Sequence, residues 1–93
     1  MNRALLPSRA FLRAARKLVK KQRAREADIQ AALDLLAADA FDPRLRTHKL
    51  SGELADSWAC SAGHDLRIVF SIVHQDQGEA IVLETIGTHD EVY

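Results

Sequence analysis

The side chains best suited to chemistry gather near the end of this chain. The run from Gly87 to Tyr93 holds a histidine, two carboxylates and a phenol directly after a β-rich segment. A second histidine, His48, lies upstream, and an acid and an arginine follow at Asp65 and Arg67. Two imidazoles, a carboxylate, an arginine and a phenol can together cleave RNA without a metal ion, because histidine transfers protons near neutral pH and arginine binds phosphate.

This chemistry assigns a role to each group. The 2′-hydroxyl of RNA must lose a proton, the charge on the phosphate must be stabilised, and the 5′-oxygen must gain a proton. We expect His48 and His89 to be the acid–base pair, in either order, which contributes about 10²–10⁴-fold to the rate. Arg67 would stabilise the phosphate charge. Asp65 would orient an imidazole or act as the base, and Tyr93 would stack on a nucleobase or reach the phosphate.

The same residues also have structural interpretations. Asp65 and Arg67 are compatible with a cross-strand ion pair, and Tyr93 is compatible with a C-terminal core anchor. The other two histidines, His64 and His74, fall at predicted turns, where we expect them to be solvated. The sequence alone leaves these alternatives open.

Length and composition favour one small domain covering residues 1–93. The apolar runs are too short to span a bilayer, and no secretory signal follows Met1. The one cysteine, Cys60, is expected to be a buried strand residue in a reducing cytoplasm. Trp58 is expected in packing rather than in RNA stacking. No set of ligand-type residues has tight metal-binding spacing, so neither a metal nor a cofactor is expected.

The charges are divided unevenly along the chain, although the net charge is zero. Nine of the thirteen lysines and arginines and none of the thirteen acids fall in residues 1–25. A basic segment of this kind lies along phosphates or an acidic partner, or is a solvated helix face balanced by the rest of the chain. The candidate RNA- or phosphate-binding residues are Lys49, Arg46, Arg67, Lys20 and Lys21.

The hydrophobic periodicity changes from helical to strand-like near residue 45 and predicts an α+β fold with two helices on one face of an antiparallel sheet. The expected elements, in the order β-α-α-β-β-β, are an extended segment at 3–7, a helix capped by Ser8, a second helix opening at Asp28 and stopped by Asp42-Pro43, and strands at 57–61, 65–73 and 80–86. Strand alternation would put Asp65 and Arg67 on the face turned away from the helices. His89 would share a face with Gly87 if the last strand continues.

Four motifs occur in an order that resembles the RelE/ParE toxin superfamily of bacterial toxin–antitoxin systems, and the YafQ-like branch most closely. They are Leu-Arg-Thr-His-Lys-Leu-Ser-Gly at 45–52, Trp-Ala-Cys at 58–60, Asp-Leu-Arg-Ile-Val-Phe at 65–70 and Ile-Gly-Thr-His-Asp-Glu-Val-Tyr at 86–93. The resemblance covers essentially the whole chain. It implies a RelE-like fold and a cytoplasmic, ribosome-dependent mRNA endonuclease that a cognate antitoxin silences.

The family's functional positions correspond to residues already singled out for their chemistry. Its histidine before the Leu-x-Gly turn matches His48, its strand aspartate matches Asp65, and its C-terminal histidine matches His89. Its terminal aromatic residue matches Tyr93, and Arg67 matches an arginine that many members carry. Two other functions remain open at this stage: a gyrase-inhibiting toxin of the ParE type, and a relative that binds an antitoxin but no longer cleaves RNA.

Overall fold

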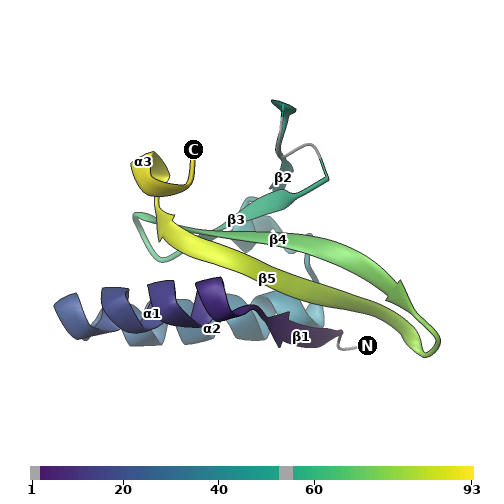
Figure 1. Ribbon diagram of the computed structural model, residues 1–93, viewed down its shortest axis with the longest axis horizontal. Helices are drawn as coiled ribbons and strands as arrows, with labels where there is room; N and C mark the ends of the chain where they lie inside the picture. The colour runs from purple at the N-terminus through teal and green to yellow at the C-terminus, as the bar shows by residue number, and fades with distance from the viewer. Residues whose placement is uncertain (1–2, 53–55) are drawn as a thin grey trace.

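The computed structural model describes residues 3–52 and 56–93 and has the α+β architecture predicted from the sequence. A five-stranded sheet with the strand order β1-β5-β4-β3-β2 forms one layer. Helices α1 and α2 lie under one face of the sheet, and α3 lies on the opposite side (Figure 1). In chain order the elements are β1 (Ala4–Pro7), α1 (Arg9–Lys21), α2 (Arg25–Ala38), a 3₁₀ turn (Pro43–Leu45), β2 (His48–Lys49), β3 (Trp58–Ala62), β4 (Leu66–Gln75), β5 (Gly78–Thr88) and α3 (His89–Val92).

The first helix begins as predicted, whereas the second begins earlier. The Ser8 hydroxyl accepts a hydrogen bond from the backbone N–H of Phe11 at 3.0 Å and so caps α1. Helix α2 starts at Arg25 rather than at Asp28, so the predicted start was wrong. The physical reason is that the acidic residues then fall in the first turn of the helix, where its dipole stabilises negative charge.

Strands β3, β4 and β5 form the antiparallel meander that the sequence predicted. Two features extend it. Strand β1 joins β5 in parallel, with Ala4 opposite Ala80, so the sheet is mixed. Strand β2, which was not predicted, pairs antiparallel with β3 and places His48 opposite Ala59. A strand of two residues is too short for alternation to be visible in the sequence.

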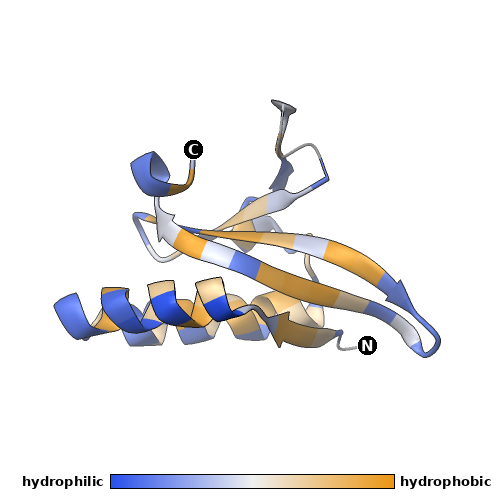
Figure 2. Cartoon of the chain, in the orientation of Figure 1, coloured by the Kyte–Doolittle hydropathy of each residue, from blue (hydrophilic) through white to orange (hydrophobic). Residues whose placement is uncertain are grey.

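The hydrophobic core lies between the sheet and the two long helices. Phe70 and Leu36 are fully buried there, and Trp58 packs against the edge of the core, as expected. Cys60 is also buried, and this burial raises the pKa of its thiol to about 12. Figure 2 shows apolar colouring along the middle of β4 and β5 and hydrophilic colouring on most of α3. In the part of the chain that the structure describes, no helix is long and apolar enough to cross a membrane.

A bulge in β5 shifts its register against β4. Val69 pairs with Thr85 but Phe70 pairs with Leu83, so Glu84 is an extra residue in β5. Its carbonyl accepts a hydrogen bond from the Ser8 hydroxyl at 2.9 Å. One hydroxyl therefore joins the start of α1 to the irregular point of the sheet.

Replacing Ser8 tests this double role. We expect Ser8→Ala to lower the free energy of unfolding by about 1–2 kcal/mol, because the helix loses its cap and the bulge carbonyl loses a donor. Urea unfolding followed by circular dichroism measures the change. Ser8→Thr is the matched control, since it keeps a hydroxyl at the cap. Equal unfolding midpoints for Ser8→Ala and the unchanged protein would show that neither bond contributes.

Candidate active site

A hydrogen bond joins the histidine of β2 to the last residue of the chain. Tyr93 Oη lies 3.0 Å from His48 Nε2, although the two residues are 45 positions apart. The other ring nitrogen, His48 Nδ1, lies 3.2 Å from the carbonyl oxygen of Arg46. Because a carbonyl oxygen only accepts, Nδ1 carries the proton in this contact. In the neutral ring Nε2 is then the acceptor, and the phenol donates to it.

The second predicted histidine lies on the other side of the same phenol. His89 is the first residue of α3, and its ring meets that of Tyr93 edge-on with centroids 4.5 Å apart. The rings of His48 and Tyr93 have centroids 6.0 Å apart. His89 Nδ1 also lies 3.5 Å from a carboxylate oxygen of Asp90, an ion pair when the imidazole is protonated. The fold thus gathers both imidazoles around Tyr93. We call His48, His89 and Tyr93 the imidazole cluster.

Arg67, in β4, acts on the imidazole cluster through its charge. It lies opposite Gly87 of β5 and Ser61 of β3, and its guanidinium donates to the Leu66 carbonyl at 2.9 Å. Burial raises the pKa of the Tyr93 phenol, and the nearby positive charge of Arg67 opposes this rise. The phenol therefore stays protonated at neutral pH and remains a hydrogen-bond donor.

Helix α3 places the last residues because the chain turns sharply at Thr88. The Thr88 side chain accepts from the backbone of Glu91, and the Glu91 carboxylate accepts from the Thr88 N–H at 2.8 Å, which is a capping box. The strand therefore ends at Thr88 and His89 begins the helix, so the condition under which His89 would share a strand face with Gly87 is not met. The helix then folds back against Gly87, where an added Cβ would lie only 3.0 Å from Glu91 Cβ.

Asp65 does not face away from the helices, which corrects the sequence-based expectation. Strand β4 begins at Leu66, so Asp65 belongs to the preceding turn, and its carboxylate bonds to Arg25 of α2 at 3.1 Å. The turn approaches α2 because Gly63, at φ 65°, has no side chain: a Cβ there would lie 2.5 Å from Asp28 Oδ2. The proposed ion pair between Asp65 and Arg67 is replaced by this pair, and a catalytic role for Asp65 remains a prediction from the resemblance.

The predicted basic residues lie in different places. Arg46 holds His48 through its carbonyl, in a left-handed conformation with φ 52°. Lys49 follows His48 in the strand and so points to the opposite face, where its ammonium lies 5.9 Å from the Trp58 ring centroid. Lys20 and Lys21 line two different grooves of α1. Their RNA-binding roles remain predictions. The two remaining histidines, His64 and His74, are exposed, as expected.

One polar pair near the candidate site had no signal in the sequence. The buried Ser57 hydroxyl donates to Glu84 Oε1 at 2.7 Å, across the intervening strand β4. Strand alternation puts Ser57 on the same face as Ala59, which pairs with His48. This contact depends on the bulge in β5, and alternation within a single strand does not reveal a bulge.

Comparison with known proteins now identifies the family. The family model described as bacterial toxin of type II toxin–antitoxin system, YafQ, matches residues 3–93. The chain belongs to this family. It is therefore a YafQ-family toxin of a type II toxin–antitoxin system. A comparison with curated protein sequences finds no match.

Solved structures share the fold of this YafQ-family toxin. YafQ from Escherichia coli superimposes with a TM-score of 0.78 at 15% identity, covering 98% of each chain. YafQ in the E. coli DinJ–YafQ toxin–antitoxin complex gives 0.76 at 16% identity, covering 100% of this chain and 99% of that one. A metal-bound toxin from Helicobacter pylori gives 0.72 at 25% identity, covering 100% of both chains.

The contact between Gly87 and α3 predicts the effect of one added methyl group. We expect Gly87→Ala to push α3 away from β5, to lower the free energy of unfolding by about 1–3 kcal/mol and to lengthen the contact between Tyr93 and His48. Urea unfolding gives the stability, and the NMR shifts of the His48 ring report the contact. Tyr93→Phe is the comparison, because it removes the hydroxyl without crowding the strand. Unchanged His48 shifts in Gly87→Ala would show that α3 does not depend on this approach.

The capping box predicts a pH dependence for α3. The backbone N–H of Thr88 holds the pKa of Glu91 below its ordinary value of 4.5, and the charges of Lys17 and Lys21 act in the same direction. A lowered folded pKa means that the stabilisation is complete above pH 4.5 and is lost as the pH falls through the folded value. The Thr88 amide signal in NMR should therefore change below pH 4.5.

Glu91→Gln is the matched control for this titration, because its amide oxygen still accepts from Thr88 and it carries no titrating group. Its Thr88 amide signal should stay constant over the same range. A signal that changes equally in both proteins would assign the titration to another carboxylate.

Proposed function

We propose that this YafQ-family toxin is an endoribonuclease that cuts mRNA on the ribosome by metal-independent acid–base catalysis and thereby inhibits translation in the bacterial cytoplasm. The observation that carries the proposal is the imidazole cluster, in which Tyr93 Oη lies 3.0 Å from His48 Nε2 and the His89 ring packs on the same phenol. Two imidazoles on one exposed surface are the groups that a proton-transfer reaction on RNA requires.

The hydrogen bonds of His48 suit it to the role of base. Its Nδ1 is engaged by the Arg46 carbonyl, so the lone pair of Nε2 points toward the phenol. When RNA displaces the phenol, Nε2 takes the proton of the 2′-hydroxyl, and the 2′-oxygen attacks the adjacent phosphorus. Phosphorus then breaks its bond to the 5′-oxygen. The products are a 2′,3′-cyclic phosphate and a 5′-hydroxyl end.

His89 is suited to the role of acid. Its Nδ1 lies 3.5 Å from the Asp90 carboxylate, which forms an ion pair with the ring when the ring is protonated. The imidazolium gives its proton to the leaving 5′-oxygen. The proton removed by His48 and the proton given by His89 balance the reaction. Exchange with water then removes a proton from His48 and returns one to His89.

Arg67 and Tyr93 complete the proposed site. The positive charge of Arg67 acts on the phenol, and its guanidinium would neutralise charge on the phosphate oxygens, as arginine does in other phosphoryl-transfer sites. The phenol, protonated at neutral pH, would donate to a phosphate oxygen or stack on a base once it leaves His48. We assign Asp65 an indirect part, because its carboxylate accepts a hydrogen bond from Arg25 at 3.1 Å.

We also propose that a cognate antitoxin protein binds and silences this chain. The support is the family assignment together with the solved E. coli complex, in which YafQ is bound to the antitoxin DinJ. The identity of the partner would follow from the neighbouring reading frame.

The cleavage proposal predicts a specific loss in histidine variants. We expect His48→Ala and His89→Ala each to reduce the rate of mRNA cleavage in a translating extract by about 10²–10⁴-fold, because each removes one proton-transfer group. Primer extension maps the new mRNA ends, and growth after induction in bacteria reports toxicity. His74→Ala is the control, since His74 is exposed at the far end of β4 and outside the imidazole cluster.

The other outcomes of this experiment oppose the proposal. If both histidine variants remain toxic and DNA damage responses rise, the chain acts on gyrase. If the unchanged protein neither cleaves mRNA nor arrests growth, the chain binds a partner without cutting RNA.

A further inference from the structure

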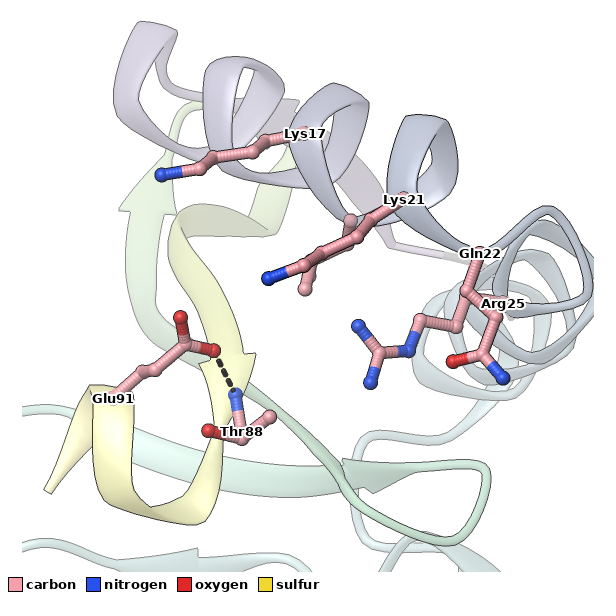
Figure 3. Close-up of a pocket in the computed structure, with 7 residues that line it drawn as sticks. Lys17, Lys21, Gln22, Arg25, Thr88 and Glu91 are labelled. Carbon is pink, nitrogen blue, oxygen red and sulfur yellow. Dashed lines mark hydrogen bonds between the residues drawn. The ribbon is translucent and has the colours of Figure 1, made fainter.

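A basic cleft lies beside the imidazole cluster, on the other side of α3. It opens between the C-terminal half of α1, the start of α2 and the end of β5, and its volume is about 440 Å³. Figure 3 shows Lys17, Lys21 and Arg25 pointing into it from one side, with Thr88 and Glu91 on the other. Lys17 and Lys21 are four residues apart, so α1 presents both on one face.

The positive groups of this cleft are incompletely satisfied. Arg25 gives one terminal nitrogen to Asp65, but its Nε is buried and has no hydrogen-bond partner. Its side chain is only 17% exposed. A buried N–H without a partner costs free energy and requires an explanation, and a bound acceptor would provide one.

The lysines are also available for a ligand. Glu91 faces them, yet one of its carboxylate oxygens accepts the Thr88 N–H in the capping box. Among residues 3–52 and 56–93, no ion pair within 4.0 Å involves Lys17 or Lys21. The cations are Lys17, Lys21 and Arg25. Only two carboxylates, Glu91 and Asp65, face them, which leaves a surplus of one positive charge. That surplus matches the single negative charge of a phosphodiester.

We propose that this cleft binds a phosphodiester group of the RNA strand that the imidazole cluster cleaves. Guanidinium and ammonium groups are the side chains that bind phosphate oxygens, and the Thr88 hydroxyl and Gln22 amide of the lining supply further hydrogen bonds. The inference rests on the proposed function and adds a second contact point for the substrate.

The position of α3 connects the two sites. Glu91 of this helix lines the cleft, and His89 of the same helix belongs to the imidazole cluster. The helix has four residues and is therefore about 6 Å long. One RNA strand can therefore pass over α3, with one phosphate in the cleft and a neighbouring phosphate at the imidazole cluster.

The test compares two pairs of substitutions on α1 that remove the same charge. The double variant Lys17→Gln with Lys21→Gln removes both ammonium groups from the cleft and keeps part of each alkyl chain. Arg9→Gln with Arg13→Gln is the matched control, because these exposed residues have the same spacing on α1 and do not line the cleft. The probe is a short RNA with 2′-O-methyl groups, which the protein binds but cannot cleave, measured by fluorescence anisotropy at several salt concentrations.

We expect the double variant at Lys17 and Lys21 to weaken RNA binding about tenfold or more. The slope of log K against log salt should fall by about 1.4, because two fewer cations contact the single-stranded RNA. The control pair should change affinity less than threefold, about the level of general attraction between the charged helix and RNA. Equal losses in both pairs would overturn the proposal, because the cleft would then contribute no more than general charge.

A second readout follows the Nε–H signal of Arg25 by NMR. In the unchanged protein the methylated RNA should shift this signal, whereas an acidic peptide of glutamates should not. A shift with the peptide and none with RNA would assign the cleft to a carboxylate partner instead. Neither readout uses cleavage, so a toxin that fails the histidine test can still pass this one, and failure here leaves the histidine test unaffected.

Discussion

The turn at Thr88 is the constraint on which the candidate site depends. The capping box stops β5, and the four residues of α3 then carry His89 and Tyr93 back over the sheet toward β2. Gly87 permits this return because it leaves room for Glu91. If the strand ran straight on, the last residues would leave the sheet and His48 Nε2 would lose its contact with Tyr93. A few local contacts, each worth about 1 kcal/mol, thus hold a long-range assembly together.

The helical layer contributes more to the candidate site than core packing alone. Arg25, at the start of α2, bonds to Asp65 in the turn that leads into β4, and the close approach of Gly63 to Asp28 brings that turn to the helix. The start of β4 positions Arg67, so the helices and this strand are linked by one ion pair. The pair is partly exposed, so its energy is small, and its main effect is to hold the turn in place.

The sequence allowed the layers to be predicted but not the contacts between them. Alternation in β4 and the cap at Ser8 are local patterns, and the structure confirms the helices and the antiparallel meander that they indicated. The family motifs singled out His48, His89 and Tyr93, which the fold then gathers. The orientation of Asp65 was predicted wrongly, because strand alternation was extended by one residue into a turn.

The remaining features had no local signal. A two-residue strand, a bulge that inserts Glu84 and a parallel partner at the edge depend on residues far apart in the chain. Alternation within one segment does not specify its neighbours. The start of α2 was missed for a different reason. Ala24 precedes that helix and has no side chain that can cap it, so the sequence gives no N-cap signal there.

The parallel pairing of β1 with β5 has a consequence for biosynthesis. Ala4 pairs with Ala80, and Arg3 binds Glu79 at 2.9 Å, 76 positions further along the chain, so β1 finds its partner strand only after most of the fold has been synthesised. Closing so long a loop slows folding, because its entropy is lost before the contacts form. The nascent chain therefore completes this sheet only after β5 has emerged, and the imidazole cluster forms only after Tyr93 has been synthesised. Until then the nascent chain lacks the cluster, although α1 and α2 have already been synthesised.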